Sequence, residues 1–189
     1  MEQAQNKSYW NAAGKAGAIF GFIVFLITII GGYITIHSEP SGSFLMMYYA
    51  SSAIGCLIAL FGGVLAVKFY INEHGKELKV GRGAVIGLFT GVFIALVSVV
   101  LSMIWPVIDS SYIDNLQNAM IANIEASTMF DSAMKDEMID ATYTQMQNYH
   151  SAGNILQMLG MGAVMYGLLN VLSGMLAAKV MGKAPEEEL

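Results

Sequence analysis

The stretch from Gly83 to Ile108 contains no charged residue, and it constrains the fold more than any other feature of the chain. At about 1.5 Å of rise per residue, a helix of this length crosses the hydrocarbon core of a bilayer with some tilt. The uncharged runs 16–36, 44–67 and 155–178 also exceed the roughly 20 residues that a membrane helix needs. Charged residues make up only 12% of the chain, about half the fraction of soluble proteins. The sequence therefore predicts one all-α, four-span (polytopic) membrane domain over residues 1–189, with spans at about 16–36, 44–67, 83–108 and 155–178.

Nearly all lysines and arginines gather on one side of these spans. Of the nine in the chain, the eight on this side are Lys7, Lys15, Lys68, Lys76, Lys79, Arg82, Lys179 and Lys183. Only Lys135 lies on the other side, within an acidic segment. Because basic loops stay in the cytoplasm, we expect both termini to be cytoplasmic and the protein to lie in the inner (cytoplasmic) membrane of a bacterium.

Residues 109–151 separate the third span from the fourth and form an insertion on the predicted outer side. Its first helically spaced apolar stripe is Ile113, Leu116, Met120 and Ile124. We predict an extracytoplasmic insertion of two amphipathic helices, with a turn at Ser127 and Thr128 and a capping box formed by Ser111 and Asp114. Surface-seeking helices are usually rich in lysine. This segment is acidic, which favours a hairpin packed on itself or on a partner over helices lying on the bilayer.

Small residues recur at helical spacing within the spans, a GxxxG-like pattern that lets helix backbones approach closely in lipid. The strip Gly83, Gly87 and Gly91 runs along one face of the third span. The second span offers a matching strip at Gly55, Ala59 and Gly63. Because short connectors hold neighbouring spans side by side, we expect the partner to lie in the same chain; the alternative is a helix of a second subunit. The predicted helix-packing residues are Gly17, Gly21, Gly55, Ala59, Gly63, Gly83, Gly87, Gly91, Asn170 and Gly174.

The ends of the second and fourth spans resemble each other. Residues 63–68 read Gly-Val-Leu-Ala-Val-Lys and residues 174–179 read Gly-Met-Leu-Ala-Ala-Lys. One interpretation is a parallel repeat of two helical hairpins, the second of which carries the insertion. The other is that small residues and a terminal lysine recur in any membrane helix.

Chemistry-bearing residues are sparse within the spans. None of the four contains Asp, Glu, Lys, Arg or His, which counts against proton-coupled transport, intramembrane proteolysis and haem binding. Asn170 lies deep in the fourth span, where we expect an interhelical hydrogen bond worth roughly 0.6 to 2 kcal/mol; the alternative is contact with a substrate. His37 and His150, with methionines nearby, would suit copper(I). Because the methionines are spread over core-like positions as space-fillers, we expect no metal site at these histidines. We also expect no catalytic residue and no cofactor.

With these features in view, the chain resembles a bacterial family of small four-span inner-membrane proteins, domain-of-unknown-function family four-one-nine-nine. The resemblance covers nearly the whole length and rests on the glycine-rich first span from Gly14 and on the connector Glu73-His74-Gly75-Lys76-Glu77 leading into Gly87. It also rests on Val107-Ile108-Asp109 at the opening of the insertion and on the tail Lys183-Ala184-Pro185-Glu186. No activity, cofactor or site is attached to that family, so the resemblance implies none.

Three functional hypotheses follow. The leading one is a non-enzymatic accessory or scaffold protein, which associates with itself as a homo-oligomer or with a larger membrane complex. The first alternative is a small transport or lipid-handling protein with its pathway between the two hairpins. The second alternative is an outer-face metal or redox site at His37 and His150. The expected surroundings are the lipid bilayer, with no nucleic acid.

Overall fold

A computed structural model describes residues 8–42 and 48–183 of the chain. These residues form the helices α1 (Trp10–His37), α2 (Tyr48–Ala59), α3 (Phe61–His74), α4 (Val80–Ile108), α5 (Tyr112–Ala126), α6 (Ser132–Gln147) and α7 (Ala152–Met181). Lys7, the first residues of the predicted second span (44–47) and the tail 184–189 lie outside the described residues.

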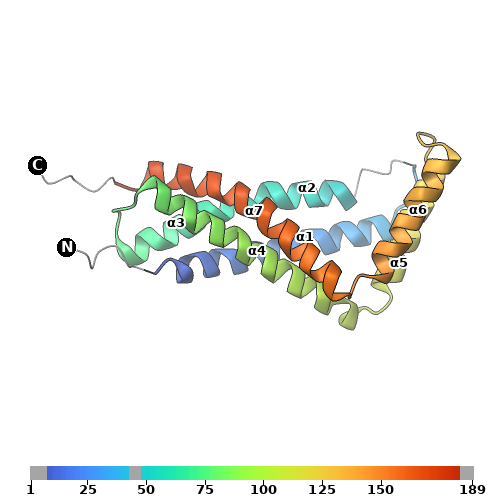
Figure 1. Cartoon of the computed structure of the whole chain (residues 1–189), viewed down its shortest axis with the longest axis horizontal. Helices are drawn as coiled ribbons and strands as arrows, with labels where there is room; N and C mark the ends of the chain where they lie inside the picture. Colours follow the sequence, from blue (N-terminus) through green and yellow to red (C-terminus); the bar gives the residue numbers. More distant parts are fainter. Residues whose placement is uncertain (1–7, 43–47, 184–189) are drawn as a thin grey trace, which may run out of the picture.

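Four of the helical stretches are long and apolar enough to cross a membrane: Trp10–His37, Ala50–His74, Val80–Ile108 and Ala152–Met181. They run lengthwise beside one another as a bundle (Figure 1). This confirms the predicted all-α fold with four spans. The second span differs from a simple helix, because it consists of α2 and α3 with an interruption at Leu60.

Helix α4 is the central element, packed against α1 along one face and against α7 along another. Its buried residues recur at three- and four-residue spacing from Gly83 to Val99, which forms one broad buried stripe along the helix. Thr90 is fully buried, and its hydroxyl donates to the Ile86 carbonyl oxygen at 2.8 Å, so this polar side chain needs no further partner.

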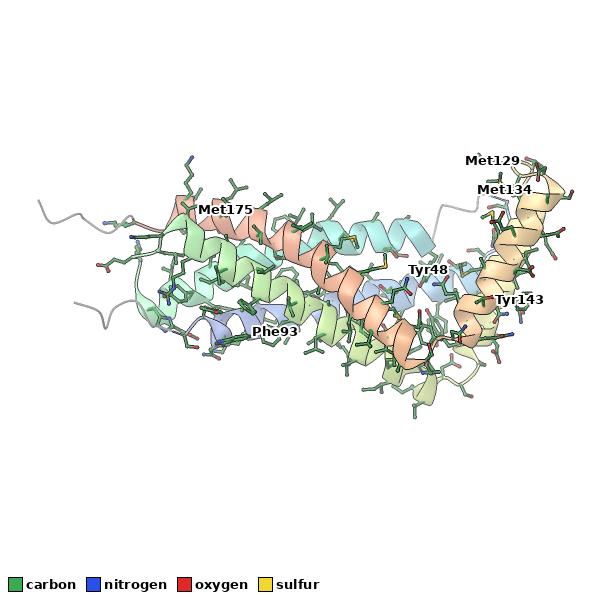
Figure 2. The ribbon with its side chains drawn as sticks, viewed as in Figure 1. Tyr48, Phe93, Met129, Met134, Tyr143 and Met175 are labelled. Carbon is green, nitrogen blue, oxygen red and sulfur yellow. The ribbon has the colours of Figure 1, made fainter. Side chains whose placement is uncertain are left out.

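Helices α5 and α6 form a hairpin that lies across one end of the bundle (Figure 1), which we call the hairpin end. Helix α5 faces the bundle: Tyr112, Leu116 and Met120 pack with Phe25 and Ile29 of α1 in one buried cluster. Figure 2 shows Met129 and Met134 at the far tip of the hairpin, away from the spans. The insertion is therefore helical: α5 docks on α1, and α6 adds Met146 to the same cluster.

The junction between α4 and α5 is held by Asp109 rather than by the predicted capping box. Tyr33 of α1 donates its hydroxyl to Asp109 at 2.5 Å, and the Ser111 hydroxyl donates to the same carboxylate at 2.7 Å. The Tyr33 hydrogen bond, with those from Ser111, holds the pKa of Asp109 below its ordinary value. Ser111 is the residue before α5, but its side chain makes no capping bond to the helix. Its oxygen accepts from the Asn115 side-chain amide at 3.3 Å instead of from a backbone N–H, so the prediction of a Ser111–Asp114 capping box is wrong.

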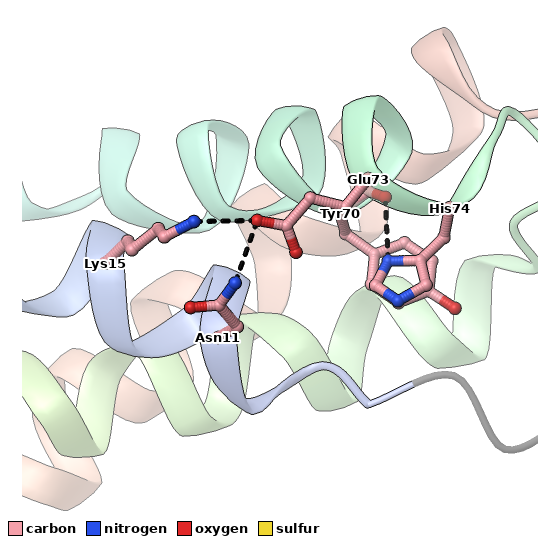
Figure 3. A network of polar contacts seen from close by, with 5 residues as sticks. All are labelled: Asn11, Lys15, Tyr70, Glu73 and His74. Atoms are coloured by element: carbon pink, nitrogen blue, oxygen red, sulfur yellow. Dashed lines mark hydrogen bonds and ion pairs between the residues drawn. The ribbon is translucent and has the colours of Figure 1, made fainter.

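The opposite end, where α1 begins and α7 ends, we call the terminus end. Here Lys15 of α1 forms an ion pair with Glu73 of α3 at 2.8 Å, and Asn11 donates to the same carboxylate at 3.0 Å (Figure 3). His74 stacks on Tyr70 one turn earlier. Of the basic residues in the described ranges, only Lys135 belongs to the hairpin end. The two ends of the bundle therefore differ in charge as the sequence predicts.

Candidate functional site

The terminus half of the bundle is closed by backbone contact between α4 and α7. A Cβ atom built at Gly83, Gly87 or Gly91 would collide with the α7 backbone, at Gly174, Asn170 and Tyr166 respectively. The third-span strip thus serves close packing, but its partner is α7. The prediction that the second span is this partner is wrong, because α7 presents its own small residues to the glycines of α4.

The interruption of the second span lies in this closed half, and Asn170 accepts a hydrogen bond from a backbone N–H that the interruption leaves without a helical partner. Helix α3 begins at Phe61, so its first N–H groups have no acceptor within their own helix. The Asn170 side-chain oxygen accepts the Gly63 N–H at 2.5 Å, while its amide donates to the Tyr166 carbonyl oxygen at 2.8 Å. Asn170 is fully buried. It acts as an N-cap supplied by a neighbouring helix, which is the interhelical hydrogen bond that we expected.

The remaining predicted packing residues divide between α1 and the second span. Gly17 and Gly21 both lie against α4, where added Cβ atoms would collide with Phe93 and Val97. Ala59 is buried in a cluster with Val24 and Ile94. Two further glycines, Gly63 and Gly174, lie against each other, so the two similar span ends (63–68 and 174–179) meet in space. At Gly55 a Cβ would make only ordinary contact, 3.7 Å from the Val24 side chain, so this glycine is not required for close approach.

The hairpin half is more open: residues 152–165 of α7 include none that is buried, although Gly162 still lies against Ala95 of α4. The α7 span is the least buried of the four. A cavity of about 630 Å³ lies between residues 24–28 of α1, 95–102 of α4 and 158–166 of α7. This volume falls within the usual range of small-molecule sites. The cavity joins the two helical hairpins, since one wall comes from the first and two walls come from the second. We call it the groove.

The groove is lined almost entirely by apolar atoms. Its side chains include Phe25, Val99 and Met165, and none of its lining residues is a basic or acidic one. Of the four hydroxyl-bearing residues in its lining, Thr28 donates to the Val24 carbonyl of its own helix at 3.0 Å and Ser98 to the Ala95 carbonyl at 3.1 Å; the other two are Ser102 and Tyr166. The groove therefore suits a hydrocarbon group and offers little to a hydrated ion or a polar solute.

A second cavity, of about 680 Å³, adjoins the groove at the hairpin end. Met158 and Met161 line both cavities. The rest of its lining carries no formal charge and is polar except for Ala141. It is drawn from the C-terminal half of α6, the connector that follows and the start of α7: Ala141, Thr144, Gln145, Asn148, Ser151, Asn154 and Gln157. We call this cavity the polar shelf. Nearby, burial raises the pKa of Tyr149 to about 12.

The two histidines that suggested a metal site have local partners. The His37 ring nitrogen lies 2.8 Å from the Tyr33 carbonyl oxygen, and His150 makes an edge-on ring contact with Tyr149. Within residues 8–42 and 48–183, no group of three or more His, Cys, Asp or Glu side chains is arranged to hold a metal ion.

Sequence reasoning did not locate the groove or the polar shelf. One signal was present: Ala95, Ser98 and Ser102 recur at the spacing of one α4 face, just beyond the glycine strip. Small and weakly polar residues on that face predict space, but they do not say whether a neighbouring helix fills it.

Fold and composition define the class: a multi-pass helical membrane protein with an apolar groove between its hairpins. The chain belongs to the family described as "Protein of unknown function (DUF4199)", whose model matches residues 15–179. No curated protein and no solved structure matches the chain. Family membership accordingly assigns no activity, and any function has to be argued from the groove and its surroundings.

Proposed function

We propose that this protein is a non-enzymatic, lipid-handling membrane protein that holds the hydrocarbon chain of a membrane lipid in the groove. The observation that carries the proposal is the apolar groove itself, which lies between the two hairpins at the depth of the spans. In a bilayer, the molecules that surround the protein at this depth are lipid chains. A groove with walls on three helices gives such a chain more contacts than the convex outer surface of a single helix does.

The chemistry of the groove favours a lipid over a transported solute. Intramembrane pathways for ions and polar solutes carry ionisable groups or exposed backbone carbonyls. Here the broken second span would be the natural place for exposed backbone groups, but Asn170 caps the Gly63 N–H. The Thr28 and Ser98 hydroxyls are also bonded within their own helices. A hydrocarbon chain makes no hydrogen-bonding demand on these groups.

Two glycines of α7 provide a matched test. Gly160 lines the groove and Gly153 does not, and a Cβ at either position would have no neighbouring atom within 4 Å. A Gly160→Phe substitution should occupy the groove without disturbing the bundle, whereas Gly153→Phe adds the same ring elsewhere on the same helix. Native mass spectrometry from a mild detergent should show one lipid-mass adduct per chain in the wild type and in Gly153→Phe, and its loss in Gly160→Phe. Equal adducts in all three proteins, or none in any, would contradict the proposal.

An accessory role is the second candidate, and the exposed apolar residues of the α5–α6 hairpin favour it. Met129 is 79% exposed and Met134 is 47% exposed at the tip, beyond the candidate spans (Figure 2). Methionine-rich surfaces adapt to varied partners. Affinity isolation of wild type and of a Met129→Lys, Met134→Lys variant tests this role. A partner, or a second copy, held by the wild type and lost from the variant would support it, and identical recovery would exclude a role for this tip.

We further propose that the terminus end faces the cytoplasm of a bacterial inner membrane. The support is the gathering of basic residues at that end, from Lys15 to Lys183, against Lys135 alone among the described residues of the hairpin end. In a Cys56→Ala background, a cysteine beside Lys76 should react only with a reagent admitted to the cytoplasm. One beside Asp131 should react only from outside, and labelling of both from one side would refute the orientation.

A further inference from the structure

We propose that the polar shelf binds the headgroup of the same lipid, and that this headgroup is zwitterionic and carries a primary amine, as in phosphatidylethanolamine. The inference rests on the proposed function, since it assigns the groove to the chain and the shelf to the head. The geometric basis is that the two cavities meet at Met158 and Met161. One amphiphile with its chain among the spans and its head at the hairpin end would occupy both cavities in the orientation that a bilayer imposes.

The shelf offers amide donors that lie against thioether sulfurs. For Gln157 the sulfur is the one acceptor among the described residues, whereas Asn154 also has a backbone carbonyl. The Gln157 amide nitrogen lies 3.9 Å from the Met161 sulfur, and the Asn154 amide nitrogen lies 3.6 Å from the Met158 sulfur and 3.2 Å from the Tyr149 carbonyl. A thioether sulfur is a weak acceptor. Phosphate or ester oxygens of a lipid would be much stronger acceptors for these amides. Both methionines have flexible side chains that can move aside as the amides change partner.

The charge pattern around the shelf selects the headgroup. No lysine or arginine lines the shelf, so nothing there neutralises the net negative charge of an anionic lipid. Glu137 and Asp140 precede Ala141 and Thr144 by four residues, and they therefore extend the shelf-lining face of α6 by one turn. Lys135 is the basic residue of the described part of this hairpin, and its ammonium donates to the Glu125 carbonyl at 2.8 Å. A primary ammonium can pair with the acidic turn while its own phosphate lies on the amides.

The test compares lipids with identical chains and different heads, added to delipidated protein and counted by native mass spectrometry. We expect phosphatidylethanolamine to bind several times more than phosphatidylglycerol or phosphatidylcholine. Gln157→Leu should lower the binding of all three lipids about two- to tenfold, the effect of losing one hydrogen bond to the shared phosphate or ester oxygens, while Gln147→Leu, outside the shelf, should leave binding unchanged. Asp140→Lys should shift the preference towards phosphatidylglycerol, and Asp114→Lys on α5 should not. Thermal unfolding of each variant in detergent establishes that it is folded.

The failures are distinguishable. If one lipid binds per chain and is displaced by Gly160→Phe, but all three headgroups bind equally or phosphatidylglycerol binds best, the headgroup inference is wrong and the groove proposal stands. If no lipid of any kind is retained, the proposed function itself is wrong, and the inference falls with it.

Discussion

The two halves of the α4–α7 pair differ although the same two helices form both. In the terminus half, Gly87 of α4 lies directly against the Asn170 backbone of α7, and no side chain separates the helices. In the hairpin half, α7 carries Met158, Met161 and Met165 beside the groove, and the helices part around a cavity. Without a hydrophobic drive between helices in lipid, close packing requires small residues on both partners. Glycine on one helix is not enough: Gly160 has no neighbour, because nothing on α4 reaches it.

The largest expected loss of stability comes from placing a side chain between the α4 and α7 backbones in the closed half. A Cβ at Gly87 collides with the Asn170 carbonyl oxygen, which is fixed in its helix and cannot turn away as a side chain would. We expect Gly87→Leu to cost about 3 kcal/mol of unfolding free energy, the upper part of the usual range for overpacking. The contact is within one chain, so the mass of the particle should not change.

Gly81→Leu is the matched control, since Gly81 lies in the first turn of the same helix with open space around it. Its midpoint of thermal unfolding in detergent should stay close to that of the wild type. If Gly87→Leu were as stable as Gly81→Leu, the closed half would not depend on backbone contact, and the contrast with the groove would lose its physical basis.

Asn170 should show a smaller effect, because its role is to satisfy one backbone group rather than to allow approach. An Asn170→Leu variant keeps the branched skeleton of the side chain but leaves the Gly63 N–H buried without its acceptor, which typically costs about 1–3 kcal/mol. Leu172→Ala, on the exposed face of the same helix, should have little effect on thermal unfolding. A neutral Asn170→Leu would mean that the interruption at Leu60 needs no cap.

The smallest expected effect concerns the docking of the hairpin end and depends on pH. The pKa of Asp109 is lowered in the folded protein, so the ionised carboxylate contributes stability above its ordinary value of 3.8. That contribution is lost as the pH falls through the lowered pKa. The midpoint of thermal unfolding of the wild type should therefore exceed that of Asp109→Asn at pH 7, and this difference should shrink below pH 3.8. A difference that grows on acidification would have the wrong sign.

The closed half is more predictable from the sequence than the open half. The four spans follow from uncharged runs of sufficient length, and the glycine strip of α4 follows from its four-residue spacing. Its partner does not follow, because both the second span and α7 offer small residues. Gly167, Asn170, Gly174 and Ala178 form such a face on α7, and only the three-dimensional arrangement decides between the two candidates.

The partner of Asn170 and the groove could not be predicted for a different physical reason. A buried asparagine predicts a hydrogen bond, but nothing local indicates that the helical hydrogen bonding is interrupted near Leu60 and leaves Gly63 in need of an acceptor. The groove is a space between three helices that come from distant parts of the sequence. Side-chain periodicity reports which face of a helix is apolar, and it does not report where two apolar faces fail to meet.

The central claim is that the hairpin half of the bundle binds a lipid chain while the terminus half excludes one. Photo-crosslinking with a phospholipid that carries a diazirine within its chain tests it most directly, with the labelled peptides identified by mass spectrometry. We predict that labelling concentrates in residues 95–102 of α4 and 158–166 of α7, and that Gly160→Phe reduces it there while Gly153→Phe does not. Exposed positions outside the groove, such as Leu88 and Leu176, should be labelled weakly and equally in all three proteins. Uniform labelling of every exposed apolar residue, unchanged by Gly160→Phe, would contradict the claim.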